Sequence, residues 1–166
     1  MATTTPTDPS PTSTELDGIL LSDVSSDQLA PLLDMMQEFN ALEDIPWSRD
    51  DVTPAVLRLL DSPELGVVAH ILEGGTLRGY VVLTWGFDLE WAGRDAFLTE
   101  LYLLPAARGR GLGRRALPLI EELARRRGAR ALHLMVRPDN QAALQLYRGA
   151  GYSSPPRAFL TKDLSG

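Results

Sequence analysis

The residues with the clearest chemical potential lie in one short run, from Arg108 to Arg115. This run holds three alternating glycines and four arginines within eight residues. Glycines let the backbone turn tightly with its N–H groups pointing into one concavity, and a helix that starts there adds the positive end of its dipole. Because the arginines add full positive charges, the run predicts a site for a phosphate or pyrophosphate.

The spacing of the glycines narrows the kind of phosphate site. Gly109, Gly111 and Gly113 form Gly-x-Gly-x-Gly, whereas dinucleotide-binding folds use Gly-x-Gly-x-x-Gly. A Walker-type phosphate loop lacks its essential residue, because Lys162 is the only lysine of the chain. A plain connection between a strand and a helix remains the structural alternative.

The elements around this run predict a mixed α/β fold, with a central mixed β-sheet flanked by helices. Apolar runs bounded by turn residues predict strands at 19–21, 66–72, 77–84, 96–104, 131–136 and within 152–164. The three strands between 66 and 104 are expected in antiparallel succession, with Gly74 and Gly75 in the first turn. The run 131–136 is apolar at nearly every position, which predicts a central strand covered on both faces.

Helices are predicted where apolar residues recur at helical spacing. They are expected after a cap at Ser25 or Ser26, from Thr53-Pro54 to Leu60, over 112–127 and over 140–148. Residues 1–17 are expected to be a disordered tail, because 11 of these 17 residues are Thr, Ser or Pro. A single domain is then expected over 18–166.

Composition and charge exclude several function classes. With no cysteine, the chain can have no disulfide, thiolate zinc site or cysteine nucleophile. No apolar stretch could cross a membrane and no secretory signal is visible, so a cytoplasmic protein without a membrane partner is expected. Residues 1–100 carry 18 acids and four arginines, whereas 101–166 carry 12 basic residues and four acids. This asymmetry favours an anionic ligand in the C-terminal half, and the pI near 4.9 argues against nucleic acid.

Two segments resemble motifs of the GNAT-type N-acetyltransferases. Residues 101–113 match the strand-and-loop motif Gln/Arg-x-x-Gly-x-Gly/Ala through Arg108, Gly111 and Gly113. Residues 140–152 match the helix motif Asn-x-x-Ala-x-x-Leu-Tyr followed by Gly-Phe, with Tyr152 in place of Phe. The resemblance extends over roughly 19–164 and implies a GNAT-like fold with acetyl-coenzyme A (acetyl-CoA) as cosubstrate.

The resemblance also assigns residues to the cosubstrate, whose pyrophosphate the backbone amides from Gly109 to Arg114 would hold. The implied set is Leu101, Tyr102, Leu103, Arg108, Gly109, Arg110, Gly111, Leu112, Gly113, Arg114, Asn140 and Tyr147. The N–H of Leu103 would bind the thioester carbonyl. Tyr147 would be the general acid, because its unperturbed pKa of about 10 exceeds that of a thiol. An ordinary core tyrosine is the alternative for Tyr147.

The general base is less clear from the sequence. Glu100 is the candidate, because an acid near this position deprotonates the amine through water in related enzymes. Strand alternation, however, places Glu100 on the opposite face from Leu101 and Leu103, with Thr99 on their face. Polyamine acetyltransferases carry an acid at the position of Thr99 as well, which this chain lacks. A salt-bridged or merely exposed carboxylate is the alternative for Glu100.

The acids near the expected acceptor site favour a cationic amine, such as a diamine, polyamine or basic amino acid. Glu43, Asp44 and Glu90 are the candidate substrate ligands, and solvated loop carboxylates are the alternative. The leading hypothesis is direct acetyl transfer to a small-molecule amine or a peptide, with no metal: His70 and His133 lie in apolar strands without a ligand-spaced partner. A non-catalytic acyl-CoA-binding module is the alternative, a nucleotide-binding protein is a weaker one, and a homodimer is possible.

Overall fold

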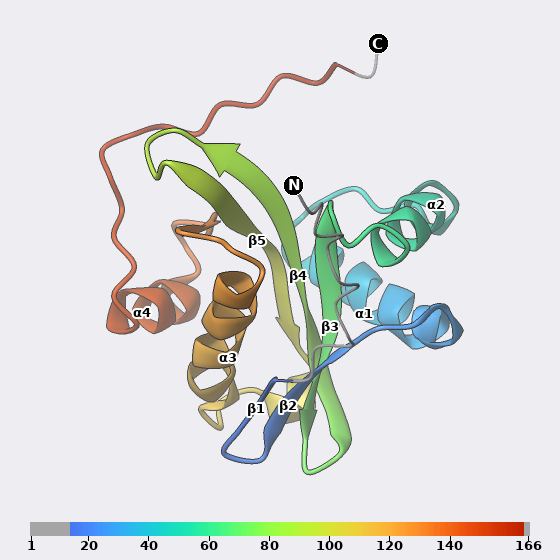
Figure 1. The fold of residues 1–166 in the computed structure, drawn as a ribbon. Coiled ribbons are helices and arrows are strands. Elements are labelled where there is room, and N and C mark those ends of the chain that lie inside the picture. The colour runs from blue at the N-terminus through green and yellow to red at the C-terminus, as the bar shows by residue number, and fades with distance from the viewer. Residues whose placement is uncertain (1–13, 165–166) are drawn as a thin grey trace, which may run out of the picture. The chain divides into compact units, whose positions relative to one another are not determined.

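A computed structural model describes residues 14–164 of the chain. The chain divides into two compact units, Met1–Met135 and Val136–Gly166. The first unit holds a six-stranded sheet and three α-helices, and the second holds one helix (Figure 1). No helix in the described range is both long and apolar enough to span a membrane. A single domain over 18–166 stays a prediction.

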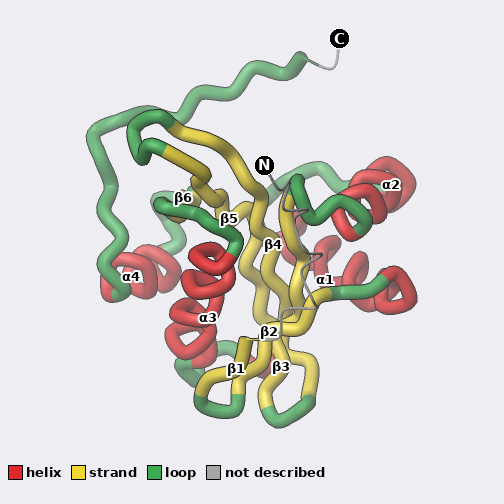
Figure 2. The backbone as a smooth tube through the Cα atoms, viewed as in Figure 1, coloured by secondary structure: helices red, strands yellow, loops and turns green. Residues whose placement is uncertain are grey.

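The strands lie in the sheet in the order in which they occur in the chain (Figure 2). They are β1 (Thr14–Leu16), β2 (Ile19–Asp23), β3 (Gly66–Glu73), β4 (Thr76–Asp88), β5 (Gly93–Leu103) and β6 (Leu132–Leu134). Neighbours from β1 to β5 are antiparallel, and β5 pairs with β6 in parallel. The predicted mixed sheet and the antiparallel succession of β3, β4 and β5 are therefore confirmed.

Helices cover both faces of this sheet. On one face, α1 (Leu29–Leu42) and α2 (Arg49–Leu60) bury apolar side chains against Val68, Tyr80, Val82 and Tyr102. On the other face lies α3 (Leu112–Arg126), whose buried residues recur at helical spacing from Leu112 to Ala124 (Figure 1). Apolar side chains therefore pack against both faces of the sheet, under α1 and α2 on one face and under α3 on the other.

The N-terminal elements differ from the prediction in two places. Thr14–Leu16 forms β1 and pairs with β2, so the last residues of the expected tail are a strand; residues 1–13 lie outside the described range. Asp17 and Gly18 turn the chain with φ of 51° and 74°, as an Asp-Gly hairpin requires. Helix α2 begins at Arg49 rather than near Thr53, because the Ser48 hydroxyl caps it by accepting from the Asp51 amide.

The C-terminal strands also differ from the prediction. The expected strand at 131–136 is only three residues long, half-buried, and lies at the edge of the described sheet rather than at its centre. Helix α4 (Gln141–Gly149) forms as expected in the second unit. No strand forms between Tyr152 and Leu164, where closing strands were predicted. Pro155 and Pro156 lack the amide donors that a strand ladder needs.

Candidate active site

The glycine-rich loop leads from β5 into α3 through a short 3₁₀ turn at Pro105–Ala107. Gly109 and Gly111 have φ of 70° and 72°, and Gly111 is the N-cap of α3. The first intrahelical bond is donated by Arg115 to the Gly111 carbonyl at 3.2 Å, so the amides of the three residues before it have no intrahelical acceptor. A Cβ added to either glycine would meet no atom within 4 Å. The loop thus presents backbone donors beside open space, which suits an anion.

The arginines of this loop are held in different ways. Arg108 folds back, with its Nε donating to the Leu103 carbonyl at 2.8 Å and its guanidinium 5.2 Å from the centre of the Tyr102 ring. Arg110 and Arg115 pair with Glu73. Arg114 is exposed, and no ion pair to it occurs within the described residues. Arg114 is therefore the arginine of the loop with the most freedom to meet a ligand.

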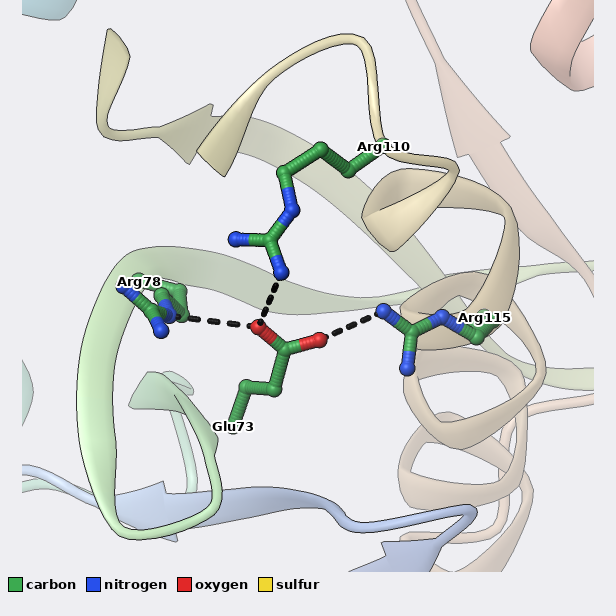
Figure 3. Close-up of polar contacts among 4 residues, drawn as sticks. All are labelled: Glu73, Arg78, Arg110 and Arg115. Atoms are coloured by element: carbon green, nitrogen blue, oxygen red, sulfur yellow. Dashed lines mark hydrogen bonds and ion pairs between the residues drawn. The ribbon is translucent and has the colours of Figure 1, made fainter. Parts of the chain in front are cut away.

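Glu73 lies at the end of β3 and gathers three arginines from different elements (Figure 3). Its Oε1 lies 2.5 Å from Arg115 of α3, and its Oε2 lies 3.3 Å from Arg78 of β4 and 3.7 Å from Arg110 of the loop. The hydrogen bond from Arg115 is the largest cause of the lowered pKa of Glu73. The cluster ties both the loop and the first turn of α3 to the β3–β4 hairpin, and it still carries more positive than negative charge.

Beyond Leu98, β5 pairs with no strand on the β6 side within the described residues. The parallel ladder between β5 and β6 ends at the pair Leu98 and Leu134, whereas β5 continues to Leu103. The Leu104 amide donates to the Arg78 carbonyl of β4 at 2.8 Å. Strand N–H groups alternate between the two edges of a strand. The N–H groups of Leu101 and Leu103 therefore point away from β4, toward the edge along which β6 no longer pairs.

A bulge interrupts β5 where the two strands separate. Val82 of β4 pairs with Glu100 and the next residue, Leu83, pairs with Leu98, so Thr99 has no opposite residue. The bulge reverses the alternation on its two sides, and Leu98 and Glu100 therefore face opposite sides of the sheet. Glu100 lies on the side of α1 with Tyr102, opposite Leu101 and Leu103, as alternation predicted. Thr99 is the extra, exposed residue of the bulge, so strand alternation does not assign its side chain to either face of the sheet.

Glu100 has a neutral partner. The buried Tyr80 hydroxyl donates to Glu100 Oε2 at 2.5 Å, and burial is the main cause of the raised pKa of Glu100. Burial also raises the pKa of Tyr80, so this hydroxyl keeps its proton. Glu100 is thus a half-buried carboxylate held by a tyrosine, neither salt-bridged nor merely exposed.

A second tyrosine–carboxylate pair lies beside the first, and the sequence interpretation missed it. Tyr102 pairs with Tyr80 across β4 and β5, with ring centres 5.8 Å apart, and its hydroxyl donates to Glu38 of α1. Burial and Glu38 raise the pKa of Tyr102 to about 12. Glu38 lies on the helix and the tyrosines lie on two strands. Only the strand register and helix packing bring them together, so no local pattern could have revealed the pair.

Two predicted site residues, Asn140 and Tyr147, belong to the second unit. The Asn140 side chain caps α4 by accepting from the Ala143 amide at 3.1 Å. The Tyr147 ring packs edge-on against Tyr152, with ring centres 5.6 Å apart. The helix motif thus has its expected local form, and the roles of both residues stay predictions.

The three predicted substrate acids do not form one group. Glu43 and Asp44 lie together just after α1, little more than one turn beyond Glu38. Glu90 lies in the turn between β4 and β5, where its amide donates to Asp88. Since β5 has 11 residues, this turn lies roughly 33 Å from Leu103 at about 3.3 Å per residue. Glu43 and Asp44 therefore follow Glu38 closely in the chain, whereas Glu90 lies at the far end of β5.

The two histidines differ, because His133 has acidic neighbours that sequence spacing alone does not reveal. His70 is buried in β3, and burial lowers its pKa, which fits the predicted core histidine. His133 lies 3.5 Å from Asp95 of β5 and, with Asp88, could offer three ligand atoms within 4.8 Å of one another. This group lies toward the Glu90 end of the sheet, far from the glycine loop, and plays no part in the site.

Comparisons with known proteins agree with this geometry. The model of the acetyltransferase (GNAT) family matches residues 32–152, which include both sequence motifs. An acetyltransferase of Yersinia pestis is 31% identical over 119 residues, covering 72% of this chain and 78% of that protein. The thialysine N-epsilon-acetyltransferase of Mus musculus is 30% identical over 90 residues, covering 51% of this chain and 53% of its own. The chain thus spans about half the length of these mammalian relatives.

Solved structures share the fold. An integron cassette protein from the mobile metagenome of a salt marsh has a TM-score of 0.76 at 29% identity, covering 88% of this chain and 91% of its own. A predicted acetyltransferase with acetyl-CoA from Clostridium acetobutylicum has a TM-score of 0.71 at 14% identity, covering 87% of this chain and 96% of its own. With both motifs inside the matched region and the fold shared, the chain belongs to the GNAT acetyltransferase family.

Proposed function

We propose that this protein transfers an acetyl group directly from acetyl-CoA to a primary amine of a cationic acceptor. The observation that carries the proposal is the continuity of two features. The end of β5, where the amides of Leu101 and Leu103 have no strand partner among the described residues, leads through a short 3₁₀ turn into a loop whose amides and arginines suit a pyrophosphate. Membership of the GNAT family supports acetyl-CoA as the donor.

In the proposed reaction, the amine nitrogen attacks the carbonyl carbon of the thioester. A C–N bond forms, the C–S bond breaks, and coenzyme A leaves as a thiolate. The amides of Leu103 and Leu101 are the proposed donors to the carbonyl oxygen as it gains negative charge. Tyr147 is the proposed acid that gives its proton to the thiolate.

Glu100 is the proposed base that takes the proton of the amine through water. A base works best when its pKa approaches the working pH, and burial moves the pKa of Glu100 in that direction. The Tyr80 hydroxyl occupies Oε2, which fixes the carboxylate and leaves Oε1 to accept a proton. Tyr80 is thus a positioning residue in this proposal.

The acceptor is proposed to be a diamine, a polyamine or a basic amino acid. Glu43 and Asp44 support this class, because they lie together just beyond the end of α1, the helix that carries Glu38. Glu90 is left out of the proposed site, because it lies at the other end of β5. The name of the mammalian relatives also refers to an amino acid that carries an amine in its side chain.

The test is release of the coenzyme A thiol from acetyl-CoA across polyamines, diamines, basic amino acids, neutral amines and short peptides. Amines with a second positive group are expected to be turned over faster than monoamines of similar size. Thiol release with monoamines alone would overturn the proposed acceptor class and leave the acetyl transfer standing. Binding of acetyl-CoA with no turnover of any amine would instead favour the non-catalytic module.

A further inference from the structure

Two carboxylates accept from neighbouring tyrosines between α1 and the sheet: Glu100 of β5 and Glu38 of α1. Tyr80 and Tyr102 are opposite each other on β4 and β5, both nearly inaccessible to solvent, with exposed fractions of 0% and 2%. Each donates its hydroxyl to one carboxylate oxygen, Tyr80 to Glu100 and Tyr102 to Glu38. A buried hydroxyl needs an acceptor, but a neutral group would satisfy it. The hydrogen bond from Tyr102 therefore does not by itself explain why this position is a glutamate rather than a neutral residue.

Glu38 has no compensating cation in the described part of the chain, where its one hydrogen bond is with Tyr102. Arg108 gives its Nε to the Leu103 carbonyl, lies over the Tyr102 ring and also interacts with Tyr102 by a side-chain hydrogen bond, but no ion pair joins it to Glu38 within the described residues. Asp34, one turn earlier on α1, is neutralised by Arg49. Glu38 is exposed, so its carboxylate is accessible to a ligand.

We propose that Glu38 binds the second cationic group of the acceptor and so selects diamines and basic amino acids over monoamines. This inference rests on the proposed function, because it takes Glu100 as the group beside the reacting amine. The two tyrosine rings are neighbours, with centres 5.8 Å apart. Because each carboxylate accepts from one of these neighbouring tyrosines, Glu38 and Glu100 lie in one region, as two amino groups joined by a short alkyl chain would need.

The two carboxylates then have different tasks. Glu100 is half-buried, and its raised pKa limits how strongly it stabilises a neighbouring ammonium, so the reacting nitrogen can lose its proton. Glu38 is exposed and can keep the distal nitrogen as an ammonium ion. The pKa of Tyr102, raised to about 12, keeps its hydroxyl a donor at neutral pH and so holds Glu38 in place.

The test is Glu38→Gln, because the amide oxygen still accepts from Tyr102 while the charge is lost. With 1,4-diaminobutane as acceptor, KM is expected to rise about tenfold with little change in kcat, because the lost contact is a charge-assisted hydrogen bond that is partly solvated. With butylamine, the monoamine of the same length, KM should rise much less, because it has no second ammonium group for Glu38 to bind. The matched control is Glu64→Gln, the same loss of charge at an exposed position between α2 and β3, which should leave both amines unaffected.

The outcomes separate the two proposals. Equal increases in KM for diamine and butylamine would mean that Glu38 only supports the fold, and no increase for either would mean that it is not a ligand; both results overturn the inference. Either result, obtained with an active wild type, leaves the acetyl transfer standing. If the wild type acetylates no amine, the proposed function fails, and calorimetric titration of 1,4-diaminobutane into wild type and Glu38→Gln in the presence of coenzyme A decides the inference alone. Weaker binding to the variant would support it, and equal binding or no binding to the wild type would overturn it.

Discussion

Two regions of the first unit use glutamate in opposite ways. At the glycine loop, Glu73 is surrounded by three arginines, and its pKa is lowered. On the face under α1, Glu100 accepts from one tyrosine hydroxyl, and burial raises its pKa. A carboxylate among cations stays charged and serves as a tie between elements, whereas a desolvated one beside a neutral donor is suited to exchange a proton. The neighbours, not the residue type, set the role.

The difference extends to the ligands that the two regions suit. The loop region keeps an excess of positive charge and free backbone donors, which attract phosphate. The region under α1 holds the carboxylates of Glu38 and Glu100, which suit ammonium groups. In the proposed direct transfer, the loop would hold an anion at a distance from the reacting atoms, and the region under α1 would hold a cation close to them. Substitutions in each region test this division.

Replacing Glu100 with Gln should have the largest effect, because it removes the proposed base while keeping an acceptor for Tyr80. We expect kcat/KM for amines to fall by about 10²–10⁴-fold. Affinity for acetyl-CoA, measured by calorimetry, should change little, because the loop is untouched. Full activity of this variant would show that Glu100 is not the base and that the region under α1 only binds.

Replacing Gly111 with Val should disable the loop region. Gly111 has φ of 72° and space beside it that a ligand would use, so a β-branched side chain opposes the backbone angles and fills that space. We expect affinity for acetyl-CoA to fall by about 100-fold or more, taking each lost phosphate contact as a charge-assisted hydrogen bond. Gly128→Val is the matched control, since Gly128 also has positive φ, at 85°, but closes the far end of α3. Unchanged affinity in a folded Gly111→Val protein would place the phosphate elsewhere.

Replacing Glu73 with Gln should have a smaller effect, confined to the donor. The variant loosens the connection between the loop, α3 and the β3–β4 hairpin, so KM for acetyl-CoA should rise. The increase should be only about threefold to tenfold, because exposed ion pairs contribute little individually. An acetyl thioester of pantetheine, which lacks the pyrophosphate, should react equally well with variant and wild type. A lower KM for acetyl-CoA would show that Glu73 competes with phosphate for the arginines rather than positioning them.

The smallest effect should be on how stability depends on pH. The folded pKa of Glu73 is lowered, so its stabilisation is present above the ordinary pKa and is lost as pH falls through the lowered value. The folded pKa of Glu100 is raised, so folding favours its protonated form, and that stabilisation is lost as pH rises through the raised value. The Tm of Glu73→Gln should therefore be below that of wild type near neutral pH, and this difference should shrink in acid. For Glu100→Gln, the Tm relative to wild type should be higher near neutral pH than in acid.

Differential scanning calorimetry at about pH 7 and about pH 4 would measure both effects, which should be on the order of 2 °C in Tm. The control is Glu64→Gln, an exposed position for which a similar Tm difference is expected at both pH values. Parallel behaviour of Glu73→Gln and Glu100→Gln would contradict the contrast between the two regions.

Short-range chemistry determined much of this protein from its sequence. The positive φ at Gly74, Gly75 and Gly111, the start of α3 at the end of the glycine loop and the cap at Asn140 all follow from neighbours within a few residues. The motif resemblance extended this to the family, which the comparisons confirmed. Where local signals were weaker, prediction failed, as at the short strand β1 and in the Pro-containing segment after Tyr152.

Tertiary structure decided which groups meet. The bulge at Thr99 sets which face Glu100 occupies, and the register of β4 and β5 places Tyr80 beside Tyr102. Helix packing then brings Glu38 to Tyr102, 64 residues away in the chain, and the fold brings Arg115 to Glu73 across 42 residues. Composition and spacing cannot encode such pairs, because a shift of one residue in strand register sends a side chain to the other face of the sheet. The sequence determined the glycine-rich loop and the start of α3, and only the packed sheet decided which carboxylates are held by arginines and which by tyrosines.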